Sequence, residues 1–125
     1  MTKMKWEQFF DAALEYAYCH DLSWLWDKSK MSDQPFEDRK SLFFSLLEKT
    51  LETGRLHLKK NGHYLSGTPE EQVQLFRKAF PTSNIPDPRY PNEDASYWFY
   101  GEECPGEAVW RVEHPDGTVE WMHCP

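Results

Sequence analysis

Cysteine and histidine are direct neighbours twice in this sequence, as Cys19-His20 and His123-Cys124. Both side chains bind zinc, but zinc sites usually space their ligands a few residues apart so that the side chains converge on one ion. The chain contains no Cys-x-x-Cys and no His-x-x-x-His spacing. Direct neighbours rarely reach the same ion, so we expect no metal site and no cofactor.

Cys104 offers a second kind of chemistry, because a cysteine with His114 or His123 has the residue types of a thiol nucleophile and its base. The sequence shows no oxyanion-binding device beside it. The neighbouring Glu102 and Glu103 raise a thiol pKa instead of activating the thiol. Adjacent carboxylates also point to opposite faces of a strand and do not share a proton. We therefore name no catalytic residue, and a small enzyme with a thiol or carboxylate centre near the Cys104 turn is the alternative function.

Charge divides the chain into two parts. Residues 1–80 hold 12 basic and 12 acidic side chains, whereas residues 81–125 hold 2 basic and 9 acidic ones. The net charge of −7 therefore arises entirely in the C-terminal third. A field of this sign repels phosphate backbones and attracts cationic surfaces. We expect a basic protein partner and no nucleic acid.

No stretch approaches the roughly 20 apolar residues that span a bilayer, and the charged start of the chain leads into no apolar signal segment. Three cysteines at unrelated spacings, Cys19, Cys104 and Cys124, favour reduced thiols over a disulfide framework. We therefore expect a cytoplasmic protein without membrane contact.

Hydrophobic periodicity and end signals predict the helices. An apolar stripe predicts a helix over 4–18, and Asp21 or Ser23 caps a short second helix. The longest helix has its cap at Asp33, with Pro35 in the first turn, and ends before Gly54, and Thr68 opens another helix by a capping box. The stripe of the first helix consists of Trp6, Phe9, Phe10, Ala13, Leu14 and Ala17.

The remaining segments predict a hairpin, a linker and a sheet. Asn61-Gly62 fits a type I′ turn that joins two short strands within 55–66, with Leu56, Leu58 and Leu65 on one face. Four prolines mark residues 81–96 as an extended linker. We predict one α+β domain over residues 1–125, with three to four helices within 4–80, the short hairpin between the long helix and the helix at Thr68, and a three-stranded antiparallel meander at 97–123.

The meander places its side chains on two faces if Pro105-Gly106 and 114–117 form its turns. Trp110 then lies opposite Trp121, and Val112 opposite Val119. The predicted core face is Phe99, Trp110, Val112, Val119 and Trp121. The predicted outer face is Trp98, Tyr100, Glu102, Val109, Arg111, Glu113, Glu120 and Met122. Aromatics rimmed by carboxylates are typical of a recognition surface, although a helix or the linker covering them is an equal alternative.

Several motifs together resemble a known family. The sequence is similar, from about Glu15 onward, to small bacterial proteins grouped as domain of unknown function 596. The similarity lies in the order of these motifs: 42–47, 54–58, 70–72, 76–81, Trp98-Phe99, 103–106, Val109-Trp110, Asp116-Gly117 and Glu120-Trp121. The family implies no activity, and several such acidic proteins resemble immunity proteins encoded beside bacterial toxins, which implies a bacterial, cytoplasmic origin.

Our first hypothesis is a non-enzymatic protein-binding module, an immunity-type inhibitor of a basic toxin. The residues expected to bind the partner are Trp98, Tyr100, Glu102, Glu113 and Glu120. A toxin that attacks nucleic acid is usually basic at its active site, so an acidic aromatic surface fits it. A structural role within a larger assembly is a third hypothesis, and the oligomeric state is left open.

Overall fold

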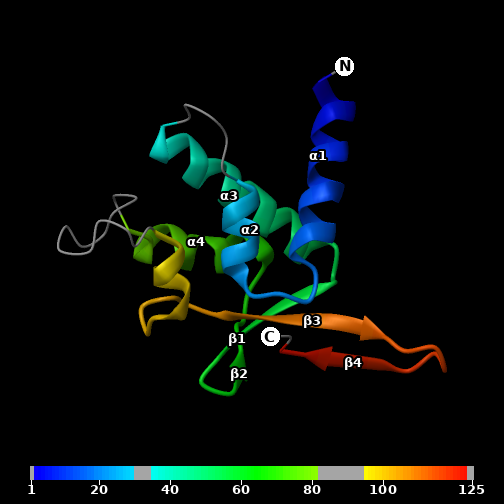
Figure 1. Cartoon of the computed structure of the whole chain (residues 1–125). Coiled ribbons are helices and arrows are strands. Elements are labelled where there is room, and N and C mark those ends of the chain that lie inside the picture. The colour runs from blue at the N-terminus through cyan, green and yellow to red at the C-terminus, as the bar shows by residue number, and fades with distance from the viewer. Residues whose placement is uncertain (1, 30–34, 82–94, 124–125) are drawn as a thin grey trace.

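The computed structural model describes residues 2–29, 35–81 and 95–123, with side chains described for 7–29, 35–81 and 98–123. Figure 1 shows the helices on one side of β3 and β4. This is the α+β fold that the sequence predicts. In chain order the elements are α1 (Thr2–Ala17), α2 (Leu22–Lys28), α3 (Phe36–Glu52), β1 (Leu56–Lys60), β2 (His63–Tyr64), α4 (Pro69–Ala79), the 3₁₀ helix η1 (Ala95–Tyr100), β3 (Glu107–Glu113) and β4 (Val119–Met122).

The helix ends follow the predicted local chemistry. Asp21 caps α2 by accepting the Ser23 backbone N–H at 2.9 Å. Thr68 and Glu71 close both bonds of the capping box of α4. Gly54 follows α3 with φ of 76°, the left-handed conformation that ends many helices. The predicted cap at Asp33 lies outside the described residues, and α3 begins directly after Pro35.

The first hairpin also forms as predicted. Asn61 and Gly62 have φ angles of 51° and 83°, as a type I′ turn requires. The Leu65 N–H donates to the Leu58 carbonyl at 2.9 Å, which places Leu58 opposite Leu65. Leu58 packs in the core with Leu56, and the half-buried Leu65 packs against it.

The predicted meander is wrong in its first strand. Residues 95–100 form η1, and β1 takes the expected place beside β3, giving the strand order β2-β1-β3-β4. Trp98 and Phe99 are both buried. Neighbours in a strand point to opposite faces, so two adjacent residues can enter one core only if the backbone coils. Packing of both aromatics therefore explains why this segment is not extended.

The register of the last hairpin differs from the prediction by one residue. Trp110 pairs with Met122 and Arg111 with Trp121, because residues 114–118 form the loop. A slip of one residue moves every side chain of a strand to the other face. Trp121 and Val119 therefore lie on the outer face, whereas Glu120 and Met122 lie on the helix-facing side; both assignments correct the prediction.

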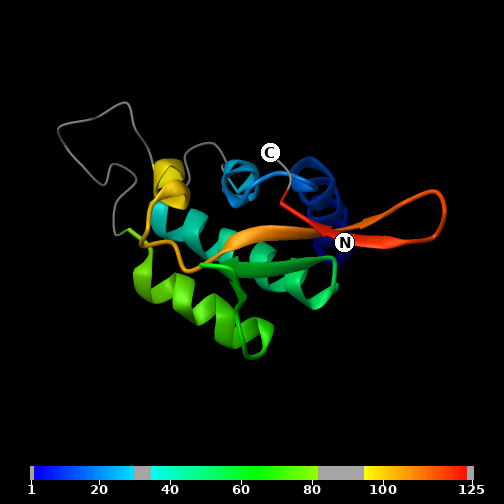
Figure 2. The ribbon, with the colours of Figure 1, turned by 90° about the horizontal axis from the view of Figure 1, so that it is seen from below.

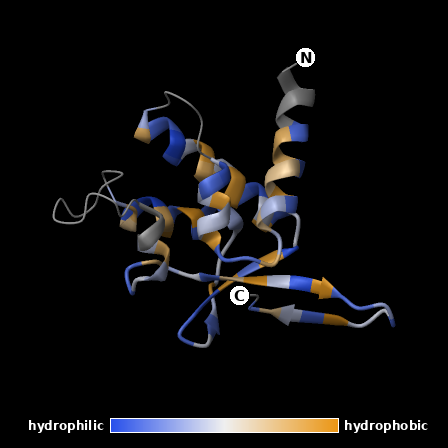
Figure 3. Ribbon diagram, in the orientation of Figure 1, coloured by the Kyte–Doolittle hydropathy of each residue, from blue (hydrophilic) through white to orange (hydrophobic). Residues whose placement is uncertain are grey.

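The core lies between the helices and the inner face of the sheet. Trp110 is 1% exposed and donates its Nε1–H to the His20 carbonyl at 2.7 Å. The buried Arg39 lies 3.8 Å from the ring centre of Trp26 and donates to the Trp26 carbonyl at 3.0 Å. Figure 3 shows hydrophobic residues along α3 and in β3, and hydrophilic ones at the β1–β2 turn. The Trp110 bond ties β3 to the segment after α1, and the Arg39 contacts tie α3 to α2.

Two further expectations can be compared with the structure. None of the helices in the described ranges is long and apolar enough to cross a membrane. Cys19 is disulfide-bonded, so the expectation of a reduced thiol is wrong at this position. Cys104 is a free thiol, as expected.

Candidate functional site

Tyr100 is the most exposed large aromatic side chain in the described part of the C-terminal third. It ends η1, and 66% of its surface is exposed. Its hydroxyl donates to Asp21 Oδ2 at 3.1 Å, and the Ser23 hydroxyl lies 3.1 Å away. Asp21 is itself fixed, because it caps α2. The phenol is therefore held at its polar end while its ring faces solvent.

The segment after Tyr100 is an anchored acidic loop at 101–106. Lys60 Nζ donates to the carbonyls of Glu102 and Cys104 at 2.9 and 2.7 Å. Because this cation binds backbone oxygens, the carboxylates of Glu102 and Glu103 stay exposed. At the end of the loop, Gly106 packs so closely that a Cβ there would lie 3.1 Å from Leu58 Cβ. The loop is therefore fixed to the hairpin.

Tyr100 stands between two hollows, each with two acidic residues in its lining. One hollow of about 500 Å³ is lined by Trp98, Tyr100, Gly101, Glu102 and Glu103. The other, of about 230 Å³, has Asp21 and Glu107 in its lining together with Tyr100. We call Tyr100, Asp21, Glu102, Glu103 and Glu107 the Tyr100 surface. An exposed ring flanked by carboxylates can stack on a guanidinium and pair with its charge.

Trp98 belongs to this site as a wall and not as an exposed contact. It is 8% exposed, and its ring centre lies 4.8 Å from that of Phe80. Its buried Nε1 has no hydrogen-bond partner within the part of the chain that the structure describes. The prediction of an outward-facing Trp98 is wrong, because η1 directs this side chain into the core.

Glu113 and Glu120 lie at the other end of β3. Seven residues of strand span roughly 20 Å, so the structure does not bring them together with Tyr100. Figures 1 and 2 show the β3–β4 tip extending beyond the helices, with η1 at the opposite end of β3. Glu113 lies 3.7 Å from Arg111 Nη2, and Glu120 lies 3.0 Å from His114 Nε2. The two glutamates are on opposite faces of the sheet.

Cys104 is unsuited to nucleophilic chemistry. The residue is 2% exposed, and burial raises the pKa of its thiol to about 11. A backbone hydrogen bond from Gly106 and the charge of Lys60 lower this pKa by less than burial raises it. The thiol is therefore protonated at neutral pH. No group of three metal-binding side chains occurs among the residues that the structure describes.

Four residues of the site were not predicted as functional: Asp21, Lys60, Glu103 and Glu107. Asp21 was recognised only as a helix cap, and its contact with Tyr100 joins residues 79 positions apart. No local pattern reveals such a contact. Glu103 stood beside a predicted site residue, so the acidic pair itself was the available signal.

Comparisons with known proteins agree with the motif resemblance. The sequence model of a family described as a protein of unknown function, DUF596, matches residues 51–122. A solved structure of an uncharacterised protein conserved in bacteria, from Neisseria meningitidis, is similar at a TM-score of 0.75 and 31% identity. The match covers 95% of this chain and 91% of that chain. No curated protein matches the sequence.

Proposed function

The chain belongs to the DUF596 family, whose description states no activity, and we propose that it is a non-enzymatic protein-binding module that engages a basic partner through the Tyr100 surface. One observation carries this proposal. Tyr100 presents an exposed ring, held by its hydroxyl, between two hollows that each have two acidic residues in their lining.

Pre-organisation supports binding at this surface. A side chain fixed before binding loses less conformational entropy when a partner covers it. Tyr100 is fixed by Asp21, and the loop at 101–106 is fixed by Lys60. Tyrosine is also among the residues that most often dominate binding energy at interfaces. The Tyr100 surface therefore combines a rigid aromatic anchor with a charged rim.

Charge supports a basic partner. The exposed carboxylates of Glu102 and Glu103 attract cationic side chains and accelerate their encounter. Lys60, the β1 cation that anchors the loop at 101–106, donates to backbone carbonyls and not to the carboxylates of Glu102 and Glu103. In its most specific form the proposal is an immunity-type inhibitor that covers the basic active site of a toxin.

Affinity capture from a bacterial lysate tests the proposal with matched baits. We expect the wild-type protein to retain a protein rich in Lys and Arg. Tyr100→Ala removes an aromatic anchor, worth about 2 kcal/mol or a thirtyfold loss of affinity. The double variant Glu102→Lys, Glu103→Lys reverses two charges of the rim and weakens capture about tenfold.

The matched control reverses two charges at the other end of β3, with Glu113→Lys and Glu120→Lys. This variant has the same net charge as the Glu102, Glu103 variant, and we expect it to retain the partner. Equal loss from both double variants would show a general charge effect and would contradict the Tyr100 surface. The immunity form further requires that the captured protein is toxic when expressed alone and harmless when co-expressed with this chain.

A further inference from the structure

Strand β4 forms one edge of the sheet, and two of its residues present unpaired backbone groups there. The strand order is β2-β1-β3-β4, so β3 covers only one side of β4. The His114 N–H donates to the Thr118 carbonyl at 2.9 Å, which fixes the alternation of the ladder. In an antiparallel pair every second residue bonds to its neighbour, so the N–H and carbonyl of Val119 and Trp121 point away from β3. Among the residues that the structure describes, neither has another backbone partner.

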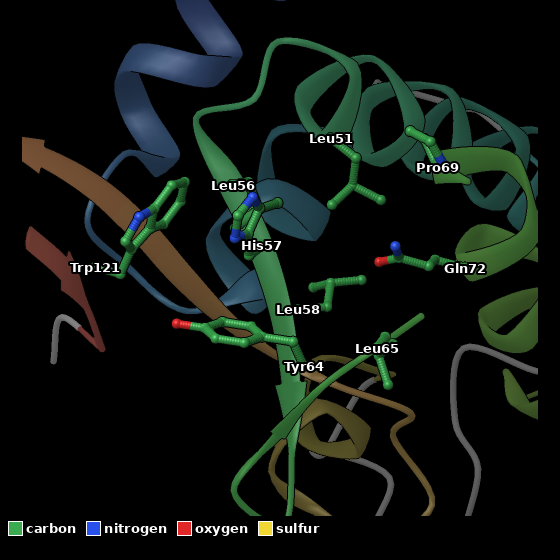
Figure 4. A pocket seen from close by; sticks show the side chains of 9 residues that line it. All are labelled: Leu51, Leu56, His57, Leu58, Tyr64, Leu65, Pro69, Gln72 and Trp121. Carbon is green, nitrogen blue, oxygen red and sulfur yellow. The ribbon is translucent and has the colours of Figure 1, made fainter. Parts of the chain in front are cut away.

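Both residues of this edge are accessible. Val119 is 42% exposed, and Trp121 is half-buried. The Trp121 ring stacks on His57, with ring centres 3.9 Å and planes 9° apart. Figure 4 shows the Trp121 ring turned toward His57 on β1. Because β1 lies beyond β3, the ring leans inward and leaves the free side of its own strand uncovered.

The two edges of the sheet differ in their protection against pairing. Native sheets shorten their edge strands or place lysine and proline on them. At the opposite edge, β2 has only two residues and pairs with Lys59 and Lys60. Strand β4 has four residues and contains no Lys, Arg or Pro. Its one charged side chain, Glu120, lies 3.0 Å from His114 Nε2. The β4 edge is therefore the one suited to pairing with another strand.

The charges near β4 allow a second copy of this chain to approach, although a net charge of −7 opposes contact between copies in general. Glu113 lies 3.7 Å from Arg111, and Glu120 is paired with His114. An antiparallel pair of β4 strands related by a two-fold axis also places the two acidic loops at 101–106 at opposite ends of the joined sheet. The carboxylates of these loops are thus kept apart.

Like charges and backbone geometry select the register of such a pair. Outward-facing residues must pair with each other, so the two-fold axis can pass at Val119, Glu120 or Trp121. An axis at Glu120 places two glutamates directly opposite each other, which is unfavourable. An axis at Val119 places Trp121 opposite Gly117 of the second copy, whose φ of 89° is not that of a strand. An axis at Trp121 avoids both problems and places Glu120 opposite Met122.

We propose that two copies of this chain pair through their β4 edges about a two-fold axis at Trp121, which joins two four-stranded sheets into one. Edges this short bury less area than a standard interface, so we expect a Kd on the order of 10 µM. The contact uses the backbone of β4, whereas the proposed basic partner contacts side chains of the Tyr100 surface. Either proposal can therefore fail without the other.

Sedimentation equilibrium of the full chain tests the association, from about 1 µM to about 500 µM. We expect the average mass to rise from one chain to a limit of two, and the Kd to fall as salt screens the like-charged copies. Binding of a basic partner at the Tyr100 surface weakens in the same salt, so failures of the two proposals are distinguishable. A monomer at every concentration, or assembly beyond two chains, overturns the proposal.

Matched proline substitutions test the location. Val119→Pro removes an N–H that points away from β3, so the ladder is kept and the Kd is expected to rise about a hundredfold. The Leu65 N–H bonds to the Leu58 carbonyl, so the N–H of Tyr64 points outward at the other edge. Tyr64→Pro is therefore the control and is expected to leave the Kd unchanged. Urea unfolding checks that both variants fold, and an unchanged Kd for a folded Val119→Pro overturns the proposal.

Backbone amide exchange locates the contact without any substitution. We expect the Trp121 amide to exchange roughly tenfold more slowly in the dimer than in the monomer. The Glu120 amide already bonds to β3, and the Tyr64 amide lies at the other edge, so both change little. Slowing at Tyr64 in place of Trp121, or no slowing at either residue, overturns pairing through β4.

Cysteine crosslinking tests the register, with the wild-type chain as the control for its native cysteines. In the proposed register Glu120 and Met122 of the two copies form a non-hydrogen-bonded pair, with Cα atoms about 4.5 Å apart. The double variant Glu120→Cys, Met122→Cys is expected to form a covalent dimer on mild oxidation, and Glu120→Cys alone is not. Rapid crosslinking of the single variant would place the axis at Glu120 and overturn the proposed register.

Discussion

The two ends of β3 both carry carboxylates, yet the structure holds them in different ways. At the start of β3, Lys60 and the packing of Gly106 tie the acidic loop at 101–106 to the first hairpin. At the other end, Glu113 and Glu120 extend on a hairpin tip and are paired with Arg111 and His114. Among the residues that the structure describes, no ion pair engages the carboxylates of Glu102 and Glu103 at the anchored end. The two acidic segments therefore differ in how their backbones are fixed, and our proposal assigns binding to the anchored one.

Replacing one glycine by asparagine at each end of β3 is expected to give the largest difference in stability between the two ends. Gly106→Asn inserts a polar side chain against Leu58 and Leu65, with its Cβ 3.1 and 3.2 Å from their carbons. We expect the free energy of unfolding to fall by about 2–4 kcal/mol. Gly117 has φ of 89° and open space around it, and asparagine tolerates the left-handed region.

Gly117→Asn is therefore expected to cost at most about 1 kcal/mol. Urea unfolding followed by tryptophan fluorescence measures both variants. Equal destabilisation would mean that the loop at 101–106 is no more tightly packed than the tip.

Replacing the cation at each end of β3 by methionine is expected to give a smaller difference in stability. Lys60→Met removes a donor to two backbone carbonyls, which is expected to cost about 1–2 kcal/mol. Arg111→Met removes only a partly exposed ion pair at 3.7 Å, worth about 0.5 kcal/mol or less. Cys104 reports the loosening directly, because alkylation of its buried thiol requires the loop to open. We expect Lys60→Met to speed this labelling about tenfold and Arg111→Met to leave it unchanged.

The pKa of the Cys104 thiol decides the pH at which its labelling is compared. Burial raises the pKa of Cys104 from 9.0 to about 11, so the native state keeps a proton that the unfolded chain loses. The contribution of this group to stability is complete below about pH 9 and is lost as the pH rises toward 11. Labelling is therefore compared at pH 7.5, where the native thiol is protonated. Rapid labelling of the wild-type protein at that pH would contradict a buried Cys104.

Local features of the fold were predicted from the sequence, whereas contacts between distant segments were not. Caps and tight turns depend on residues a few positions apart, so the Thr68 capping box and the Asn61-Gly62 turn were predicted correctly, and Asp21 was one of two caps predicted for α2. The pairing of β1 with β3 joins Leu56 to Trp110, and no local pattern specifies it. A run of aromatics at 97–100 has strand-like composition, and only the burial of both Trp98 and Phe99 reveals the 3₁₀ helix.

The candidate site was predicted in part for the same reason. Tyr100 and Glu102 were named from the outer face of a predicted strand that does not form, and both line the larger hollow beside Tyr100. Glu113 and Glu120 were grouped with them because one continuous strand face was assumed. A single-residue difference in the 114–118 loop moved Glu120 to the other side of β4. Side-chain grouping in a sheet is thus only as reliable as the turn that sets its register.

The smallest expected effect is a change in the pKa of Asp116, at the tip of the β3–β4 hairpin. Hydrogen bonds from the Thr118 hydroxyl and then from its backbone N–H hold the pKa of Asp116 below its usual 3.8. A lowered native pKa stabilises the fold above the unfolded value, and this contribution is lost as the pH falls through the native pKa. Thr118→Val removes the hydroxyl and keeps the N–H, so the Asp116 pKa should rise part of the way toward 3.8. Carboxyl carbon NMR titration measures it, and a concurrent shift at Glu102 would show that the two ends of β3 are coupled.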